Sequence, residues 1–361
     1  MAMTFRERLA GAVVMAPMTK GSNLPYRRLC VEMGARVTLS EMTVARRLKQ
    51  RRKGEFALIR RAPGETCFGV QLAGTNPEEL AWAAALVEER GADFVDVNFG
   101  CPIDHFTRKG LGAAMGRQPR RMQRIIEAMK RAVQRIPVTG KIRLGWSDED
   151  RNFLDQARAL EAGGVDAITV HGRTRNARYR LAADWDAIGQ VVAAVSVPVV
   201  GNGDILFPHE VDEARARAGC VAVMAARGVL IKPWLFREVT DGYRDMDAEA
   251  RLAVYRRYVV LALEHWGADA HGQARVREFL RWHAAFWCRY AGRRVDGSWP
   301  SMQHREPAAS GRAPLVELLA RSDGPALEFV TDGLLAGVPL DPARVPSAQA
   351  VEDLTDAAVE G

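Results

Sequence analysis

Eight short runs of β-branched or otherwise apolar residues recur along the first two thirds of the chain, with helical patterns between them. The runs cover residues 11–16, 37–40, 67–72, 94–98, 138–142, 167–170, 199–201 and 222–225. Segments 77–90 and 119–134 repeat apolar residues at three- to four-residue spacing, which indicates amphipathic helices. Eight strand–helix units predict an α/β protein with a (β/α)8 TIM barrel. A doubly wound sheet is the alternative, although such sheets more often have roughly five or six strands.

The pattern changes after residue 243. Helical runs follow at 248–265, 275–290, 315–321 and 325–335, and no strand-like alternation accompanies them. Helices joined by short loops pack as a bundle. We therefore expect a barrel domain over residues 1–243 and a small all-helical domain over 244–338. The last segment, 339–361, is rich in proline, alanine and acids and is expected to form a disordered acidic tail.

Size and composition fit a cytoplasmic enzyme. The chain has 361 residues, enough for a barrel of about 250 residues and a small appendage. It contains no run of about 18 apolar residues, which argues against a membrane span. The apolar run that ends at Pro17 is interpreted as a first strand rather than a signal peptide. Five widely spaced cysteines without a CxxC pair suggest neither a disulfide framework nor a metal site, and they suit a reducing compartment.

The charge is uneven along the chain. The formal net charge is +7, and because the last 21 residues hold five acids and one base, the remainder carries +11. Such a balance favours a polyanionic partner such as nucleic acid. Arginine-rich surfaces also arise from genome composition, so charge alone does not decide the partner.

One thiol stands at a strand end. Cys101 leaves the run 94–98 through the turn Asn98-Phe99-Gly100-Cys101-Pro102, which places it at the carboxyl edge of the predicted sheet. Ligands of parallel α/β proteins bind at that edge. The alternative is that Cys101 is one more buried small hydrophobic residue.

The other strand ends carry a chemically coherent set of residues. They are Pro17, Met18, Thr19, Gln71, Asn98, Lys141, Arg143, His171, Asn202, Gly203, Asp204, Ala226 and Arg227. Barrels often bind phosphate at the loops after strands seven and eight, where glycines allow close backbone approach. Gln71 can bond to the edge of a heterocycle, and Lys141 can stabilise negative charge on a reduced flavin, so FMN is the predicted cofactor. Each residue also has an alternative interpretation. Gly201 to Asp204 can be read as a simple tight turn, Lys141 as the partner of a carboxylate, and His171 as an interior histidine whose hydrogen bonds are made within the protein.

Seven short motifs lie at or near the strand ends: APM at 16–18, NFGCP at 98–102, KIR at 141–143, VHGRTR at 170–175, ADW at 183–185, GNGD at 201–204 and ARG at 226–228. Together they make the chain resemble the tRNA-dihydrouridine synthase family along almost its whole length. Segments 101–115 and 226–236 are most similar to the branch, best known from eukaryotes, that modifies the tRNA variable loop. We expect the chain to lack the zinc-finger extension of the eukaryotic members.

The resemblance implies the activity and the cofactors. Members of the family reduce the C5=C6 bond of a uridine in tRNA to 5,6-dihydrouridine, with FMN as cofactor and NADPH (or NADH) as reductant. The fold it implies is an FMN-binding barrel followed by a helical tRNA-binding domain, and we expect a monomer without metal. Two other functions stay open: an FMN barrel that reduces a free pyrimidine or another enone, and a non-catalytic RNA-binding protein on a barrel scaffold.

The resemblance also implies residue roles. Cys101 is the implied proton donor, and Asn98 and Arg143 lie near the uracil or the flavin. The implied FMN contacts are Pro17, Met18, Thr19, Gln71, Lys141, His171, Asn202, Gly203, Asp204, Ala226 and Arg227. Ala226 stands where many members have glycine, and its methyl group is expected to be tolerated if backbone N–H groups make the phosphate contacts.

RNA contacts are predicted from clustered cations. Arg173, Arg175, Arg178 and Tyr179 follow the sixth strand and are expected to meet phosphate or bases at the pocket mouth. Basic residues within 46–53 and within 275–294 are candidates to track the RNA backbone. For any one of these residues, a solvated loop is the alternative.

Overall fold

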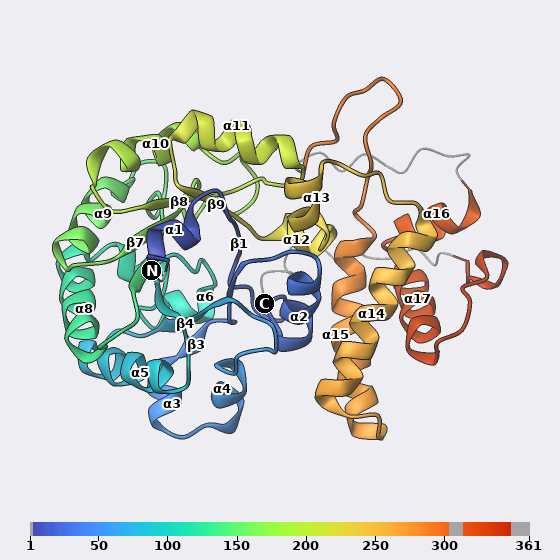
Figure 1. The fold of residues 1–361 in the computed structure, drawn as a ribbon, viewed down its shortest axis with the longest axis horizontal. Coiled ribbons are helices and arrows are strands. Elements are labelled where there is room, and N and C mark those ends of the chain that lie inside the picture. Colours follow the sequence, from blue (N-terminus) through green and yellow to red (C-terminus); the bar gives the residue numbers. More distant parts are fainter. Residues whose placement is uncertain (1–2, 303–312, 348–361) are drawn as a thin grey trace.

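The computed structural model describes residues 3–302 and 313–347 (Figure 1). Residues 1–2, 303–312 and 348–361 lie outside this description, and with them most of the expected acidic tail. In Figure 1 the barrel lies on the left and the C-terminal helices stand beside it on the right.

Eight parallel strands close into a barrel. They are β1 (Val13–Met15), β2 (Val37–Leu39), β4 (Cys67–Ala73), β5 (Phe94–Asn98), β6 (Val138–Arg143), β7 (Ala167–His171), β8 (Val199–Asn202) and β9 (Ala222–Ala225). Each pairs with the next, β2 pairs with β4, and β9 returns to β1 through the pair Val14 and Met224. The predicted (β/α)8 barrel is confirmed.

A ninth strand, β3 (Thr43–Val44), was not predicted. It pairs with the carboxyl end of β4, at Leu72 and Ala73. Two residues are too few to show the alternation by which strands are recognised in a sequence. The strand leads directly into α3 (Ala45–Lys49) and α4 (Lys53–Leu58).

Helices surround the barrel. They are α1 (Phe5–Leu9), α2 (Leu24–Glu32), α5 (Pro77–Glu89), α6 (Asp104–Thr107), α7 (Ala113–Gly116), α8 (Pro119–Ala132), α9 (Phe153–Ala162), α10 (Trp185–Ala194), α11 (Pro208–Ala218), α12 (Arg227–Ile231) and α13 (Leu235–Asp241). The apolar spacing of α8 puts Met122, Ile125, Ile126 and Met129 on one buried face. This face packs the helix against the sheet, so burial of apolar area holds the strand ends in a fixed ring.

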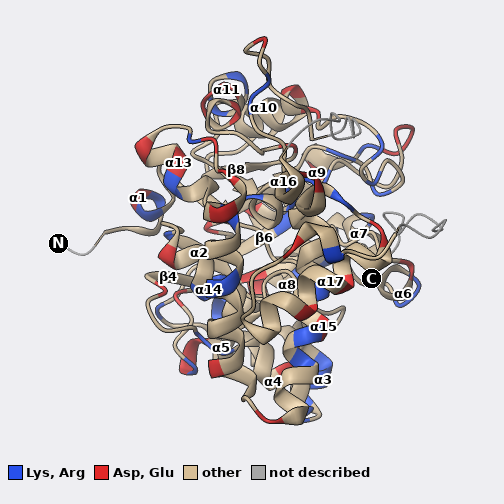
Figure 2. Ribbon diagram, turned by 90° about the vertical axis from the view of Figure 1, so that its right-hand side faces the viewer, with Lys and Arg blue, Asp and Glu red and all other residues tan. Residues whose placement is uncertain are grey.

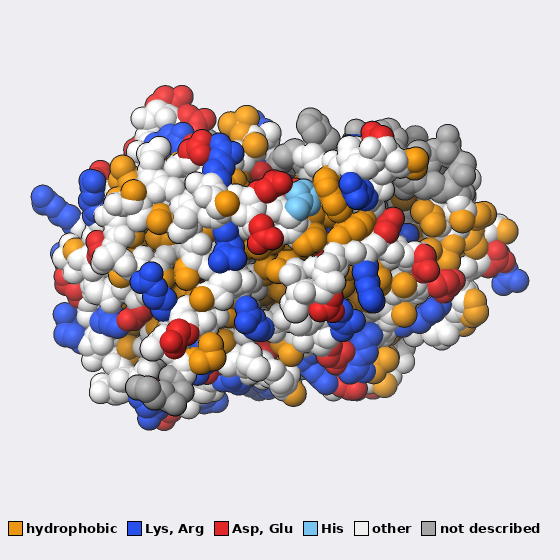
Figure 3. Space-filling view, turned by 45° about the horizontal axis from the view of Figure 1, so that its top comes forward, with side chains coloured by type: hydrophobic (Ala, Val, Ile, Leu, Met, Phe, Trp, Pro, Cys, Tyr) orange, Lys and Arg blue, Asp and Glu red, His pale blue; other side chains and the backbone are white. Residues whose placement is uncertain are grey.

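The C-terminal region is helical, as predicted, with α14 (Ala248–Trp266), α15 (Ala270–Trp287), α16 (Pro314–Ala320) and α17 (Gly324–Ala336). It docks on the barrel helix α2, where the ring of His283 stacks on Tyr26 at 4.0 Å between centroids. Asn23 Nδ2 also lies 3.0 Å from His283 Nε2. One continuous hydrophobic core runs through both regions, and hydrophobic side chains gather between them on the face shown in Figure 3.

The predicted boundary at 243–244 falls in the connection between α13 and α14. Near the other end, Leu340 is buried and a 3₁₀ turn forms over Pro342–Arg344. The first residues of the expected tail therefore pack against the helices.

Candidate active site

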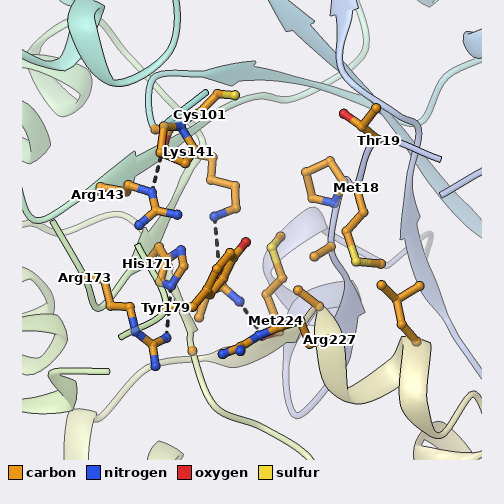
Figure 4. Close-up of a pocket in the computed structure, with 18 of the residues that line it drawn as sticks. Met18, Thr19, Cys101, Lys141, Arg143, His171, Arg173, Tyr179, Met224 and Arg227 are labelled. Atoms are coloured by element: carbon orange, nitrogen blue, oxygen red, sulfur yellow. Dashed lines mark hydrogen bonds between the residues drawn. The ribbon is translucent and has the colours of Figure 1, made fainter. Parts of the chain in front are cut away.

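A cavity opens at the carboxyl end of the barrel (Figure 4). The space within it, with the open mouth and adjoining solvent included, is about 1150 Å³. All but two of the predicted site residues line it: Pro17, Met18, Thr19, Gln71, Asn98, Cys101, Lys141, Arg143, His171, Arg173, Tyr179, Asn202, Gly203, Asp204, Ala226 and Arg227. The predicted residues from different strand ends therefore meet at one cavity.

Hydrogen bonds from both sides hold the turn that carries Cys101. Asn98 Oδ1 accepts from the backbone N–H of Gly100 at 3.1 Å and of Cys101 at 2.7 Å. Arg143 Nε donates to the Gly100 carbonyl at 2.8 Å. None of the five cysteines forms a disulfide, and Cys101 alone among them is partly exposed. Its place in the cavity wall excludes the alternative of a buried core residue.

A chain of side-chain hydrogen bonds fixes the amides beside the thiol. Asn98 Nδ2 donates to Gln71 Oε1 at 2.8 Å, and Gln71 Nε2 donates to Asp96 Oδ2 at 2.7 Å. Thr139 donates to the other oxygen of Asp96 at 2.6 Å. Burial raises the pKa of Asp96 to about 6. Asp96 therefore supports the site from behind, a role that sequence reasoning missed although a carboxylate within the apolar run 94–97 was its signal.

Lys141 points into the cavity and bonds to an amide. Its Nζ donates to Asn202 Oδ1 at 3.0 Å, and Asn202 Nδ2 donates to the Met224 carbonyl at 2.8 Å. Burial, and after it the charge of Arg143, lower the pKa of Lys141 to about 7. The Lys141 amine thus bonds to an amide and, among the described residues, forms no ion pair with a carboxylate, although the nearby Asp96 raises its pKa.

His171 is buried beside cations. Burial lowers its pKa well below the usual value, and Arg143, Lys141, Arg173 and Arg227 lower it further. Arg173 Nη1 lies 3.3 Å from His171 Nε2, and because a guanidinium can only donate, Nε2 is the acceptor. The neutral ring is thus held in one orientation.

One carboxylate clamps two guanidiniums after β8. Asp204 pairs with Arg173 at 2.5 Å and with Arg227 at 3.2 Å. The Arg227 guanidinium lies 4.3 Å from the centre of the Tyr179 ring. Asp204 takes a left-handed backbone conformation with φ of +52°, which is uncommon outside glycine. In this conformation the carboxylate reaches both arginines.

Close backbone approach characterises the last two strand ends. A Cβ at Gly228 would lie 1.8 Å from the Ile205 carbonyl oxygen, and one at Gly203 would lie 2.4 Å from Ala183 Cβ. Gly228 thus lets the loop after β9 touch the loop after β8, and Gly203 lets the loop after β8 touch the segment after β7. Ala226 has φ of −110°, so its methyl group does not require the left-handed conformation that favours glycine.

The charges lining the cavity suit a phosphate-bearing cofactor. Among its lining residues, Lys141, Arg143, Arg173 and Arg227 are basic, and Asp204 is the sole acid. The excess of positive charge suits a phosphate group, and the fixed amides of Gln71 and Asn98 suit the polar edge of a heterocycle. The residues present therefore fit FMN.

Apolar residues from distant segments complete the wall, and sequence reasoning missed them. They are Met42, Ile103, Ile205, Met224, Leu230, Trp282, Phe286 and Met302. Trp282 and Phe286 come from α15, so the helical region contributes to the cavity. Their four-residue spacing placed them on one helix face, but it could not show that this face meets the barrel mouth.

Arg175 and Arg178 do not line the cavity. Both contact the carboxylate of Asp104, on the segment that follows Cys101, with Arg178 at 3.9 Å. The Arg175 guanidinium also lies 4.7 Å from the centre of the Trp146 ring. The two arginines thus join the loop after β7 to the loop after β5, and their predicted contact with substrate stays a prediction.

The described residues contain neither a membrane-spanning helix nor a cluster of metal ligands. None of the helices within 3–302 and 313–347 combines the length and apolar character needed to cross a bilayer. Across the same residues, no three His, Cys, Asp or Glu side chains come together as a candidate metal site.

The family model described as "Dihydrouridine synthase (Dus)" matches residues 14–286. The chain belongs to the dihydrouridine synthase family. Among similar proteins is the "tRNA-dihydrouridine(47) synthase [NAD(P)(+)]-like" protein of Homo sapiens, 36% identical over 95% of this chain and 53% of that protein. The "tRNA-dihydrouridine(47) synthase [NAD(P)(+)]" of Cryptococcus neoformans is 38% identical over 86% of this chain and 45% of that protein. The chain thus spans about half the length of these family members.

Solved structures show the same fold. The complex of a 2-naphthoyl-CoA reductase with 2-naphthoyl-CoA superposes with a TM-score of 0.51 at 12% identity, over 65% of this chain and 50% of that one. At this level of identity the likeness concerns the barrel architecture alone.

Proposed function

We propose that this chain reduces the C5=C6 bond of a uridine in tRNA to 5,6-dihydrouridine. One observation carries the proposal: a single cavity is lined by the Cys101 thiol, the Asn98–Gln71 amide pair, Lys141 and an arginine cluster. An enone-like ring needs a proton donor on one face and a hydride source on the other, and this cavity offers a fixed donor beside a site suited to FMN.

The cofactor site follows the barrel's strand ends. Gln71, Lys141 and His171 would hold the ring system, with Pro17, Met18 and Thr19 beside it. The phosphate would lie against Asn202, Gly203, Asp204, Ala226 and Arg227, where backbone and guanidinium donors converge. When bound and reduced by NADPH or NADH, FMN supplies the hydride for the uracil ring.

Cys101 would give the second hydrogen. Hydride addition at C6 leaves negative charge on the base, and the thiol S–H bond breaks to protonate C5 as a general acid. The resulting thiolate regains its proton from solvent through the open mouth. Asn98 and Arg143, which hold the turn of residues 98–102, keep the sulfur at a fixed place in the wall.

The proposed substrate is tRNA. Support comes from the names of the two relatives, which specify dihydrouridine 47 in tRNA, and from the net charge of +7. A base within folded RNA must be turned outward before its edge and face can be read. We extend the proposal to uridine 47 and to a cytoplasmic monomer, and the absence of disulfides suits that compartment.

The test uses recombinant protein, NADPH and an unmodified tRNA transcript. We expect yellow protein with bound flavin, and dihydrouridine at one position of the tRNA by mass spectrometry. Cys101→Ala should keep FMN and tRNA binding while the rate falls about 10²-fold or more. An unchanged rate in that variant would exclude the assigned role of Cys101.

The same preparations separate the rival functions. Reduction of free uridine but not of tRNA would establish the pyrimidine reductase. A colourless protein that binds tRNA without modifying it would establish the non-catalytic alternative.

A further inference from the structure

The structure separates two basic segments that look alike in sequence. On α15, Arg275 pairs with Glu278 at 3.0 Å. Arg277 pairs with Asp332 at 2.6 Å and Arg281 with Glu328 at 3.3 Å, both acids lying on α17. Arg277 and Arg281 therefore join α15 to α17, and Arg275 is paired within α15, so the charges of all three arginines are offset by neighbouring acids.

The segment over α3 and α4 is different. Its cations Arg46, Lys49, Arg51, Arg52 and Lys53, named here the α3–α4 ridge, are all exposed. Within the described residues, none of the five has an acidic side chain in ion-pairing distance. Their neighbour Arg47 does, at 3.2 Å from Glu55. Figure 2 shows the basic residues of α3 and α15.

Buried anchors hold the ridge in place. Ala45 and Leu48 are fully buried, and Glu55 accepts a hydrogen bond from the backbone N–H of Val44 at 2.8 Å. Arg51 takes a left-handed conformation with φ of +57° in the turn between the helices. Five like charges thus stand on a fixed backbone, although crowding them is unfavourable in the absence of counter-charges.

The ridge lies at the same end of the barrel as the cavity. It follows β2 and β3 at their carboxyl ends, and Met42, just before β3, lines the cavity. Arg46 follows Met42 by four positions, and because an extended chain spans at most about 3.6 Å per residue, the two backbones are within about 14 Å. A polyanion on the ridge would therefore pass close to the mouth.

We propose that the α3–α4 ridge binds the phosphate backbone of the tRNA whose uridine enters the cavity. The inference rests on the proposed function and names the surface by which the barrel itself holds the RNA. Arginine, three of the five cations, suits the bidentate geometry of phosphate. An anionic membrane fits less well, because no large exposed hydrophobic side chain lies within 45–58 to insert into lipid.

The experiment compares two triple variants of the holoenzyme. The ridge variant carries Arg46→Gln, Lys49→Gln and Arg52→Gln. The control carries Arg6→Gln, Arg36→Gln and Arg131→Gln, and all three arginines are exposed. Arg36 immediately precedes β2, and Arg6 and Arg131 lie on the helices before β1 and β6, so the three lie at the opposite end of the barrel. Both lose three positive charges. The probe is an unmodified tRNA transcript, with affinity followed by fluorescence anisotropy between 50 and 200 mM KCl, the range over which such salt effects are usually compared.

Each phosphate contact contributes about 0.7–0.9 to the slope of log affinity against log salt. The ridge variant should therefore have a slope shallower by about 2–3 than the wild type. Between 50 and 200 mM KCl, the factor by which its affinity falls should be roughly 20- to 40-fold smaller than the factor for the wild type. The control should match the wild type in slope. NADPH oxidation without tRNA should be equal in all three proteins, which shows an intact fold and cofactor site.

Three other results would overturn the inference, and each points to a different failure. A ridge variant that matches the control while the wild type binds and modifies tRNA would overturn the ridge alone. Failure of the wild type to bind tRNA would overturn the proposed function and the ridge with it. Loss of binding to phosphatidylserine vesicles with tRNA binding intact would assign the ridge to a membrane instead.

Discussion

Replacing Gly112 by alanine would press a methyl group against Cys101. Gly112 has φ of +60° and precedes α7. A Cβ built there would lie 2.7 Å from the Cys101 carbonyl oxygen and 2.8 Å from Cys101 Cβ. Carbon atoms pack at about 3.5 Å or more, so the turn that carries the thiol must move by roughly 0.7 Å or the loop must open. The change thus displaces the proposed proton donor without altering its chemistry.

Two terms set the expected size of the effect. Any side chain in this backbone conformation costs on the order of 1–3 kcal/mol, and the overlap adds about 1–3 kcal/mol. Gly110→Ala is the matched control. It too has positive φ, +77°, but its nearest contact would be Thr75 Cγ2 at 3.6 Å. Both variants bear the backbone strain, and only Gly112→Ala bears the overlap.

The assay is single-turnover formation of dihydrouridine in a tRNA transcript, with flavin content and tRNA affinity measured in parallel. A misplacement near 1 Å reduces rate about 10²-fold, so Gly112→Ala should react some tens to a hundred times more slowly than Gly110→Ala at equal flavin content. Rates within twofold of each other in the two variants would refute the argument that the position of Cys101 limits the reaction.

Further outcomes follow from the charges around the cavity. Arg227→Met should weaken FMN binding roughly 10- to 150-fold and leave riboflavin binding unchanged, because a charge-assisted hydrogen bond contributes about 1.5–3 kcal/mol. Equal losses for the two flavins, measured by fluorescence quenching, would place the phosphate elsewhere. Asp96 has its folded pKa raised from 3.8 to about 6, so its stabilising contribution is complete below pH 4 and is lost as the pH rises to about 6. Relative to Asp96→Asn, the wild type should lose up to about 3 kcal/mol of unfolding free energy over that interval. Parallel urea denaturation curves for both proteins across this range would contradict it.

The barrel was predictable because its strands are buried. Runs such as 94–98 and 138–142 are rich in β-branched and apolar residues, and each is followed by a helical pattern. The alternation of strands and helices therefore appears directly in the sequence. The strand-end residues were predictable for the same reason, since parallel strands carry their final residues to one edge. β3 was missed because its two residues show no pattern.

The remaining features depend on contacts between distant segments. Trp282 and Phe286 reach the cavity only because α15 packs on α2, and neither the spacing nor the chemistry of α15 specifies that contact. Arg175 and Arg178 were predicted at the mouth, but the structure pairs them with Asp104. Local sequence shows where a charge lies along the chain, and it does not show which opposite charge folds against it.

The central claim is that the cavity around Cys101 reduces a uridine held in tRNA. Its most direct measurement is position-resolved mass spectrometry of an unmodified tRNA transcript after incubation with the flavin-loaded protein and NADPH. The account predicts a mass gain of about two hydrogens at one uridine with the wild type, and none above background with Cys101→Ala under the same conditions. Equal modification by both proteins, or none by a yellow, tRNA-binding wild type, would contradict it.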